Sequence, residues 1–133
     1  MLAEEVGVAI AGPLKLNVQI TRDGQPAIGP GKALVMEAVA RTGSISAAGR
    51  DLGMSYRRIW LLVDDLNGSW AERVVETRAG GGTAGGAKLT AFGEQLLAVY
   101  REVEASMVAA AQGERLDWLV AALRDMPDAE GVD

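Results

Sequence analysis

The chain has no cysteine and no histidine among its 133 residues. Without cysteine it can form no disulfides, no thiolate metal sites and no thiol nucleophile. Without histidine it also lacks the commonest general base and the commonest transition-metal ligand, so that carboxylates alone would have to do such work. We therefore expect neither catalysis nor a bound metal or cofactor.

Long apolar runs are absent as well. No window approaches the roughly 18 uninterrupted apolar residues of a membrane span, so we expect no membrane partner. Glu4 and Glu5 lie where a signal peptide needs positive charge. With 49% apolar residues the chain nevertheless has the composition of one folded domain. These features predict a cytoplasmic protein.

The net charge of −5 at first argues against a nucleic-acid partner. The charges are unevenly distributed, however. Residues 41–90 hold seven basic and five acidic side chains, a net of +2, whereas the remainder holds six basic and thirteen acidic ones. DNA affinity depends on the local placement of cations rather than on the sum over the chain. The middle of the chain is therefore a modest candidate for a DNA-binding surface.

Hydrophobic periodicity predicts a mainly α fold with a small β-hairpin. Residues 14–21 alternate apolar and polar side chains, which is typical of a half-buried strand, and residues 22–26 have the composition of a turn. Pro30 and Gly31 precede a helical pattern whose apolar stripe is made by Leu34, Val35, Ala38 and Val39, and Thr42-Gly43 ends it. Gly43 is well suited to a left-handed cap at its end.

Two short helices follow in the next stretch. The first is expected over 46–52, with Ser44 or Ser46 as its cap, and the second runs from a cap at Ser55 to about Asn67. A turn of three to four residues that contains a glycine joins them, which is the spacing of a helix-turn-helix. Small residues in the first helix would allow the second helix to cross it closely.

The second helix has the two faces that a DNA recognition helix needs. Its apolar stripe is made by Ile59, Leu62, Val63 and Leu66. Its N-terminal end presents polar side chains that could reach base edges or phosphates, namely Ser55, Tyr56, Arg57 and Arg58. An ordinary α-hairpin in a helical bundle has the same spacing, so this pattern leaves both alternatives open.

A β-hairpin after these helices favours the DNA-binding alternative. Short strands are expected at 74–78 and 87–90, with the glycine-rich loop Gly80–Gly86 between them and the cations Arg78 and Lys88 beside it. Such a wing can follow a phosphate backbone, and glycine permits a close approach. The glycines expected to take part are Gly81, Gly82, Gly85 and Gly86. A surface hairpin without a ligand is the other interpretation.

Two further patterns resemble a nucleotide-binding loop and a metal site, but neither has the context that such a site needs. Gly80, Gly82 and Gly85 fit G-x-G-x-x-G, but a strand follows the loop where a nucleotide-binding fold needs a helix. Asp64 and Asp65 are adjacent, so that on a helix they point about 100° apart and do not converge on a metal ion. We interpret the two aspartates as solvated helix surface, and Trp60 as a residue that packs on the core.

A long helix is predicted over 91–112. Its apolar stripe of Phe92, Leu96, Val99, Val103 and Met107 extends beyond what a small helix cluster needs. Burial within the same domain would explain it, but we favour a dimer interface, which would place two recognition helices about one DNA turn apart. Residues 1–112 would then form one DNA-binding domain. Residues 113–133 contribute only an amphipathic segment over 114–124 and an acidic tail.

The runs GSISAAGRDLGMSYRRIWLLVDDLN and VVETRAGGGTAGGAKLTAFGEQLLAVY resemble the N-terminal DNA-binding domain of the ModE family, molybdate-responsive transcription regulators related to LysR-type helix-turn-helix proteins. The resemblance covers residues 14–112 in outline. It implies a homodimeric regulator that binds a palindromic site on double-stranded DNA near genes of molybdenum transport or metabolism. By position, residues 55–58 match the recognition helix, and Arg78 with the glycine loop matches the wing.

One feature of that family has no counterpart in this sequence. Two-domain members carry a C-terminal oxyanion-binding module of β-strands, which residues 113–133 are too few to build. The resemblance therefore supports DNA binding and does not support direct molybdate binding. Two alternatives remain: a protein–protein interaction module that kept the winged-helix fold, and a small oxyanion-binding protein that uses the glycine loop.

Overall fold

The computed structural model describes residues 7–78 and 86–125. These residues form a winged helix-turn-helix that is mainly α, as predicted, with three pairs of short antiparallel strands. Along the chain the elements are β1 Ala9–Ala11, β2 Leu14–Leu16, β3 Ile20–Arg22, β4 Gln25–Ile28, α1 Pro30–Thr42, α2 Ile45–Leu52, α3 Tyr56–Ser69, β5 Val75–Arg78, β6 Gly86–Leu89, α4 Ala91–Ala111 and α5 Glu114–Ala121. Within the described residues, no helix is long and apolar enough to cross a membrane.

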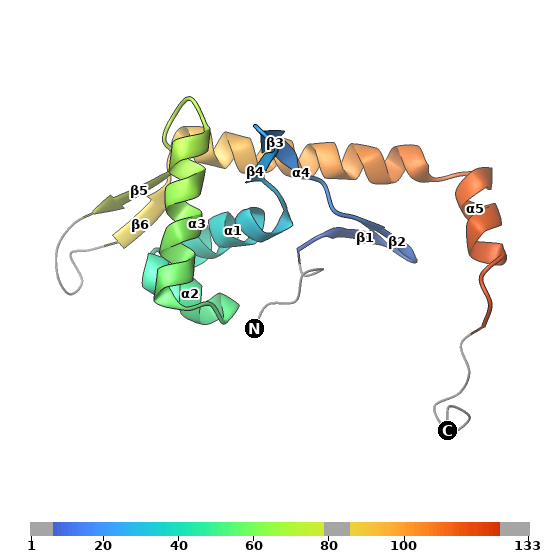
Figure 1. Ribbon diagram of the computed structural model, residues 1–133, viewed down its shortest axis with the longest axis horizontal. Coiled ribbons are helices and arrows are strands. Elements are labelled where there is room, and N and C mark those ends of the chain that lie inside the picture. The colour runs from blue at the N-terminus through green and yellow to red at the C-terminus, as the bar shows by residue number, and fades with distance from the viewer. Residues whose placement is uncertain (1–6, 79–85, 126–133) are drawn as a thin grey trace, which may run out of the picture.

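The long helix α4 runs along one side of the molecule (Figure 1). At one of its ends lie the three helices α1, α2 and α3, with the β5–β6 hairpin projecting from them. The β1–β2 hairpin packs against α4 farther along. α5 lies at the opposite end of α4, away from the three-helix cluster. The helix-turn-helix and the far end of α4 are therefore separate surfaces of one molecule.

The core lies where α1, α2, α3 and the β5–β6 hairpin meet. Its largest fully buried side chains are Ile28, Met36, Ile59, Leu66, Val35, Val39, Val63, Val74 and Val75. The predicted inner face of α3 is confirmed, with Leu62 half-buried at its margin. The buried face of α1 is broader than the predicted stripe, because Ala33 and Met36 are also buried whereas Leu34 is half-buried.

The prediction of one strand over residues 14–21 is wrong. This run is divided between β2, which pairs with β1, and β3, which pairs with β4. Alternation of side chains reports which face is buried but not which strand is the partner, so it continues unbroken across two hairpins. The predicted turn is tighter than expected: Asp23 and Gly24 form it, both with positive φ, and Pro26 lies within β4.

α3 continues to Ser69, two residues beyond its predicted end at about Asn67. The side chain of Asn67 does not terminate the helix but ties it to the strand that follows. Its Oδ1 accepts hydrogen bonds from the backbone N–H groups of Val74 and Val75, each at 2.9 Å, and its Nδ2 donates to the carbonyl oxygen of Val75 at 3.0 Å. α5 likewise ends at Ala121 rather than at the predicted position 124.

Candidate nucleic-acid interface

In the turn between α2 and α3, Gly53 ends the first helix and Ser55 caps the second. Gly53 adopts a left-handed conformation with φ of 69°, and the hydroxyl oxygen of Ser55 accepts a hydrogen bond from the backbone N–H of Arg58 at 3.1 Å. The helices cross at Gly49, where an added Cβ would lie 3.2 Å from Cγ2 of Ile59. The small residues of α2 therefore set how closely the two helices approach, as the sequence predicts.

Ser44 and Ser46 lie at the start of α2. The hydroxyl of Ser44 accepts a hydrogen bond from the backbone N–H of Ala47 at 3.1 Å, so that Ser44 is the cap of this helix. It also lies 3.1 Å from the hydroxyl of Ser46. The two side chains thus hold the first turn of α2, and a DNA contact by either one stays a prediction.

The first turn of α3 is polar and exposed. Tyr56, Arg57 and Arg58 are all exposed, and neither guanidinium forms an ion pair with another described residue. The ring of Tyr56 packs edge-on against Trp60, with ring centroids 6.1 Å apart. Trp60 in turn packs against the core, as predicted. Two cations that pair with no carboxylate of the described chain are therefore presented at the positive end of the helix dipole.

Polar groups hold the C-terminal end of α3 against α1 and β4. Lys32 of α1 is only 8% exposed, and its Nζ donates hydrogen bonds to the carbonyl oxygen of Pro26 at 2.6 Å and to Asp65 of α3 at 2.5 Å. The indole Nε1 of Trp70 donates to the carbonyl oxygen of Ala27 at 3.2 Å. The interpretation of Asp65 as solvated surface is thus incomplete, because its exposed carboxylate also pairs with a buried cation.

The role of Lys32 in positioning α3 was not predicted from the sequence. A signal for it exists, since Lys32 lies three residues before Val35 and seven before Val39, on the buried face of α1. A lysine at such a position must find an acceptor, because burial of an unpaired ammonium costs a large free energy. Which carboxylate accepts from it depends on the packing of α3 and is not visible in the local pattern.

The β5–β6 hairpin has one buried and one exposed face. Val75, Ala87 and Leu89 are buried, whereas Glu76, Arg78 and Lys88 are exposed. The hairpin is held to the helices by a hydrogen bond from the backbone N–H of Ala87 to the carbonyl oxygen of Gly43 at 2.9 Å. The wing is therefore a fixed part of the domain at its base.

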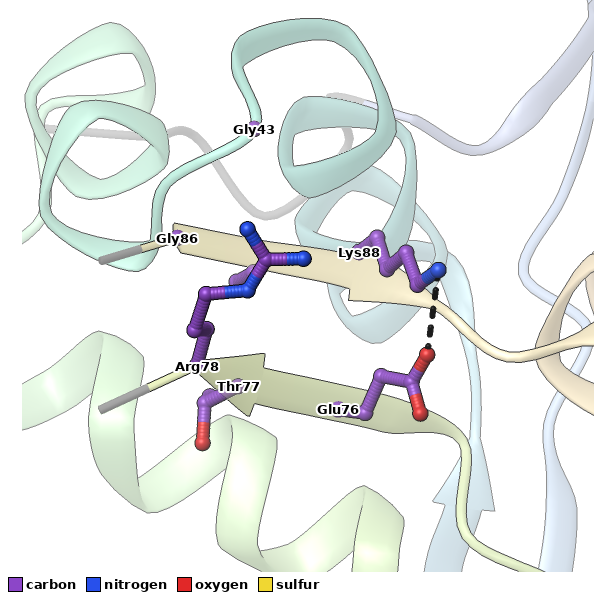
Figure 2. A pocket seen from close by; sticks show the side chains of 7 residues that line it. Gly43, Glu76, Thr77, Arg78, Gly86 and Lys88 are labelled. Atoms are coloured by element: carbon purple, nitrogen blue, oxygen red, sulfur yellow. Dashed lines mark ion pairs between the residues drawn. The ribbon is translucent and has the colours of Figure 1, made fainter. Parts of the chain in front are cut away.

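A cavity of about 440 Å³ lies at this base, between the wing and the end of α1 (Figure 2). Arg78 reaches across the hairpin toward Gly86, its partner in register, which has no side chain in the way. Nζ of Lys88 lies 3.4 Å from the carboxylate of Glu76. The residues that line the cavity are Gly43, Glu76, Thr77, Arg78, Gly86, Ala87 and Lys88. The predicted wing residues Gly81, Gly82 and Gly85 lie outside the described residues.

The apolar stripe of α4 is half-buried at its start and exposed along the rest. Phe92 and Leu96 pack against the core. Val99, Val103 and Met107 are 47%, 38% and 47% exposed. Burial within the same domain therefore accounts for the first two turns of the stripe and leaves the remaining apolar surface in solvent.

The middle of α4 is clamped to α1 by charged groups. Arg101 donates hydrogen bonds to both carboxylate oxygens of Glu37, each at 3.1 Å, and to Glu104 at 2.7 Å. The hydroxyl of Tyr100 donates to the carbonyl oxygen of Val18 at 2.7 Å. Burial, and then the neighbouring charge of Glu104, raise the pKa of Tyr100 well above its usual value, so this donor stays protonated.

Residues 32–94 match the family model of bacterial regulatory helix-turn-helix proteins of the lysR family. The match includes the whole helix-turn-helix, the wing and the start of α4. The match therefore falls on the residues that form the candidate interface.

Curated relatives support the resemblance to ModE. The chain is 38% identical over 107 residues to the molybdenum-pterin-binding protein MopB of Rhodobacter capsulatus, a match of 80% of this chain and 39% of the relative. It is 35% identical over 98 residues to MopA of the same organism, covering 74% and 37%. It is also 34% identical over 87 residues to the DNA-binding transcriptional dual regulator ModE of Escherichia coli (strain K12), covering 65% and 31%.

The chain spans about two fifths of the length of the first two of these relatives. The resemblance inferred from the sequence motifs is confirmed at this level. The names of the three relatives describe binding proteins and a transcription regulator.

Proposed function

We propose that this protein is a DNA-binding transcriptional regulator. The premise is that residues 32–94 match the lysR-type helix-turn-helix family and that the chain is similar to ModE and Mop proteins. The observation that carries the proposal is the pair Arg57 and Arg58, exposed and free of ion pairs with described residues at the start of α3. The protein acts by binding, without catalysis.

In the proposed complex the start of α3 enters the major groove. Arg57 and Arg58 then contact base edges or phosphates, because a guanidinium pairs with guanine or with a phosphate through two hydrogen bonds. Ser55 and Tyr56 extend this contact surface. Arg78 and Lys88 of the wing neutralise phosphates beside the groove, where DNA affinity comes mainly from such charge pairs.

Dimerisation through the exposed part of α4 completes the proposal. Two copies related by a two-fold axis would present two copies of α3 to a palindromic site. The resemblance to ModE and the names of the Mop relatives suggest that the regulated genes serve molybdenum transport or metabolism. Such a regulator works where the DNA is, in the cytoplasm. We expect that the protein does not bind molybdate directly. Calorimetry with molybdate and tungstate should therefore detect no heat of binding.

The net charge of −5 favours a second candidate, an interaction module that has kept the winged-helix fold without binding DNA. The two candidates differ in one property that is simple to measure. A DNA-binding regulator enriches a common sequence from a pool of random duplexes, whereas an interaction module enriches none.

Selection from such a pool, followed by footprinting of the enriched duplex, tests the proposal. We expect a two-fold symmetric site that wild-type protein protects and the R57A/R58A double variant does not. The R115A/R124A double variant removes the same charge from exposed residues near α5 and should protect the site like wild type. Failure of wild-type protein to enrich any sequence would overturn the proposal in favour of the interaction module.

A further inference from the structure

The exposed face of α3 carries a large apolar side chain that the proposed contacts do not use. Leu61 is 55% exposed in the middle of this helix. Tyr56 is the other exposed large apolar residue of the described helix-turn-helix and wing; the remaining ones are on β1, β3, α4 and the segment 118–123. Isolated exposed leucines are ordinary on protein surfaces, so the position of Leu61 has to decide its role.

Leu61 lies on the outermost line of α3. At 100° for each residue it is about 160° around the helix from the buried side chains Ile59 and Val63. Arg57 lies one turn earlier on the same outer face, because residues four apart are neighbours on a helix surface. Any groove that receives the guanidinium of Arg57 therefore receives the side chain of Leu61 next to it.

The charges along α3 indicate which part of this face approaches DNA. Arg57 and Arg58 precede Leu61, whereas Asp64 follows it and is exposed. Asp65 is turned to the buried ammonium of Lys32. Phosphates attract the two arginines and repel the carboxylate of Asp64, so the first half of α3 enters deepest and Leu61 lies at the end of that half.

We propose that Leu61 is a specificity-determining residue that contacts the 5-methyl group of a thymine in the major groove. This methyl group is the apolar feature that base pairs present in that groove, and it is absent from the other bases. The inference rests on the proposed function, since it assumes that α3 reads DNA. It adds a base identity next to the position that Arg57 contacts.

The test replaces thymidine by deoxyuridine, one position at a time, in the duplex enriched by wild-type protein. This change removes the methyl group and keeps base pairing. We expect about a four-fold loss of wild-type affinity at one position in each half-site, the equivalent of roughly 0.8 kcal/mol for a buried methyl group. The L61A variant should bind more weakly to the thymine duplex and be indifferent to the substitution at that position.

A matched control is L123A, which truncates another exposed leucine (65%) beyond α5. It should retain the wild-type response to deoxyuridine, and both variants should keep the wild-type melting temperature because both side chains are exposed. An enriched duplex at which L61A and wild type respond alike to every substitution would overturn the role of Leu61 and leave the proposed function intact. If wild-type protein enriched no duplex, both proposals would fail.

Discussion

Gly93 in the first turn of α4 lies directly against the backbone of Val74. A Cβ added to Gly93 would lie 2.3 Å from the carbonyl oxygen of Val74, so that one of the two backbones would have to move. Gly68 in α3 is also helical, but an added Cβ there meets no atom within 4 Å. Alanine variants at these two positions therefore distinguish the effect of the close backbone contact on stability from the effect of helix propensity.

We predict that G93A lowers the free energy of unfolding by about 1–3 kcal/mol, the usual cost of an overpacked contact, although alanine is the better helix former. G68A should raise it by up to about 1 kcal/mol, since only propensity changes. Urea denaturation of both variants measures the difference. An equal change of the same sign in both would contradict the close contact between α4 and Val74.

The buried ammonium of Lys32 gives a second prediction for single side chains. K32M keeps the length of the side chain but removes both hydrogen bonds, and should lower the free energy of unfolding by about 1.5–3 kcal/mol, as is typical for bonds to charged groups. D65N should cost less, about 1 kcal/mol or below, because Asp65 is solvated. Urea denaturation compares the two; a larger destabilisation by D65N would show that the bond to Pro26 contributes little.

At the level of elements, Asn67 couples α3 to the β5–β6 hairpin. Its side chain makes three hydrogen bonds to the backbone at the start of β5, so that α3 and the β5–β6 hairpin keep a fixed relation. If DNA is bound by α3 and the wing together, this relation sets the distance between their contacts.

We predict that N67A lowers the free energy of unfolding by about 1.5–4.5 kcal/mol, the sum for three such bonds. N67D keeps the oxygen that accepts from Val74 and Val75 but removes the donor to the carbonyl oxygen of Val75, and should retain more of the stability. Chemical denaturation ranks the variants as wild type, then N67D, then N67A. An N67A variant as stable as wild type would contradict the role of these hydrogen bonds.

The sequence predicted those elements whose cause is local. The cap at Ser55, the left-handed Gly43 and the buried stripe of α3 all follow from side chains within one or two turns. The pairing of β2 with β1 and of β3 with β4 was missed, because strands of three or four residues carry too little pattern. The clamp of Arg101 on Glu37 joins residues far apart in sequence and leaves no local signal.

The same distinction applies to the candidate interface. The exposure of Arg57, Arg58, Arg78 and Lys88 follows from helix and strand periodicity, so the sequence alone could predict it. The pairing of Lys88 with Glu76 depends on the register of the hairpin, and the anchoring of α3 through Lys32 depends on packing between helices. Neither could be obtained before the elements were placed.

At the scale of the whole molecule, the exposed stripe of α4 predicts self-association. The V103D/M107D variant places two charges on this stripe and should sediment as a monomer where wild type sediments as a dimer, because a buried unpaired charge is costly. A105D adds a charge on the other side of the helix and should leave the dimer intact. Wild-type protein that sediments as a monomer at micromolar concentration would contradict the prediction.

The measurement that tests the central claim most directly is the salt dependence of binding to the enriched duplex for wild type, R57A/R58A and R115A/R124A. We predict that R57A/R58A weakens binding at least about ten-fold, since one base-reading arginine contributes roughly 1–3 kcal/mol, and lowers the salt slope by about one for each phosphate that the variant no longer neutralises. R115A/R124A, with the same change in net charge, should match wild type in affinity and slope. Equal behaviour of the two double variants would contradict recognition of DNA by the helix that begins after Ser55.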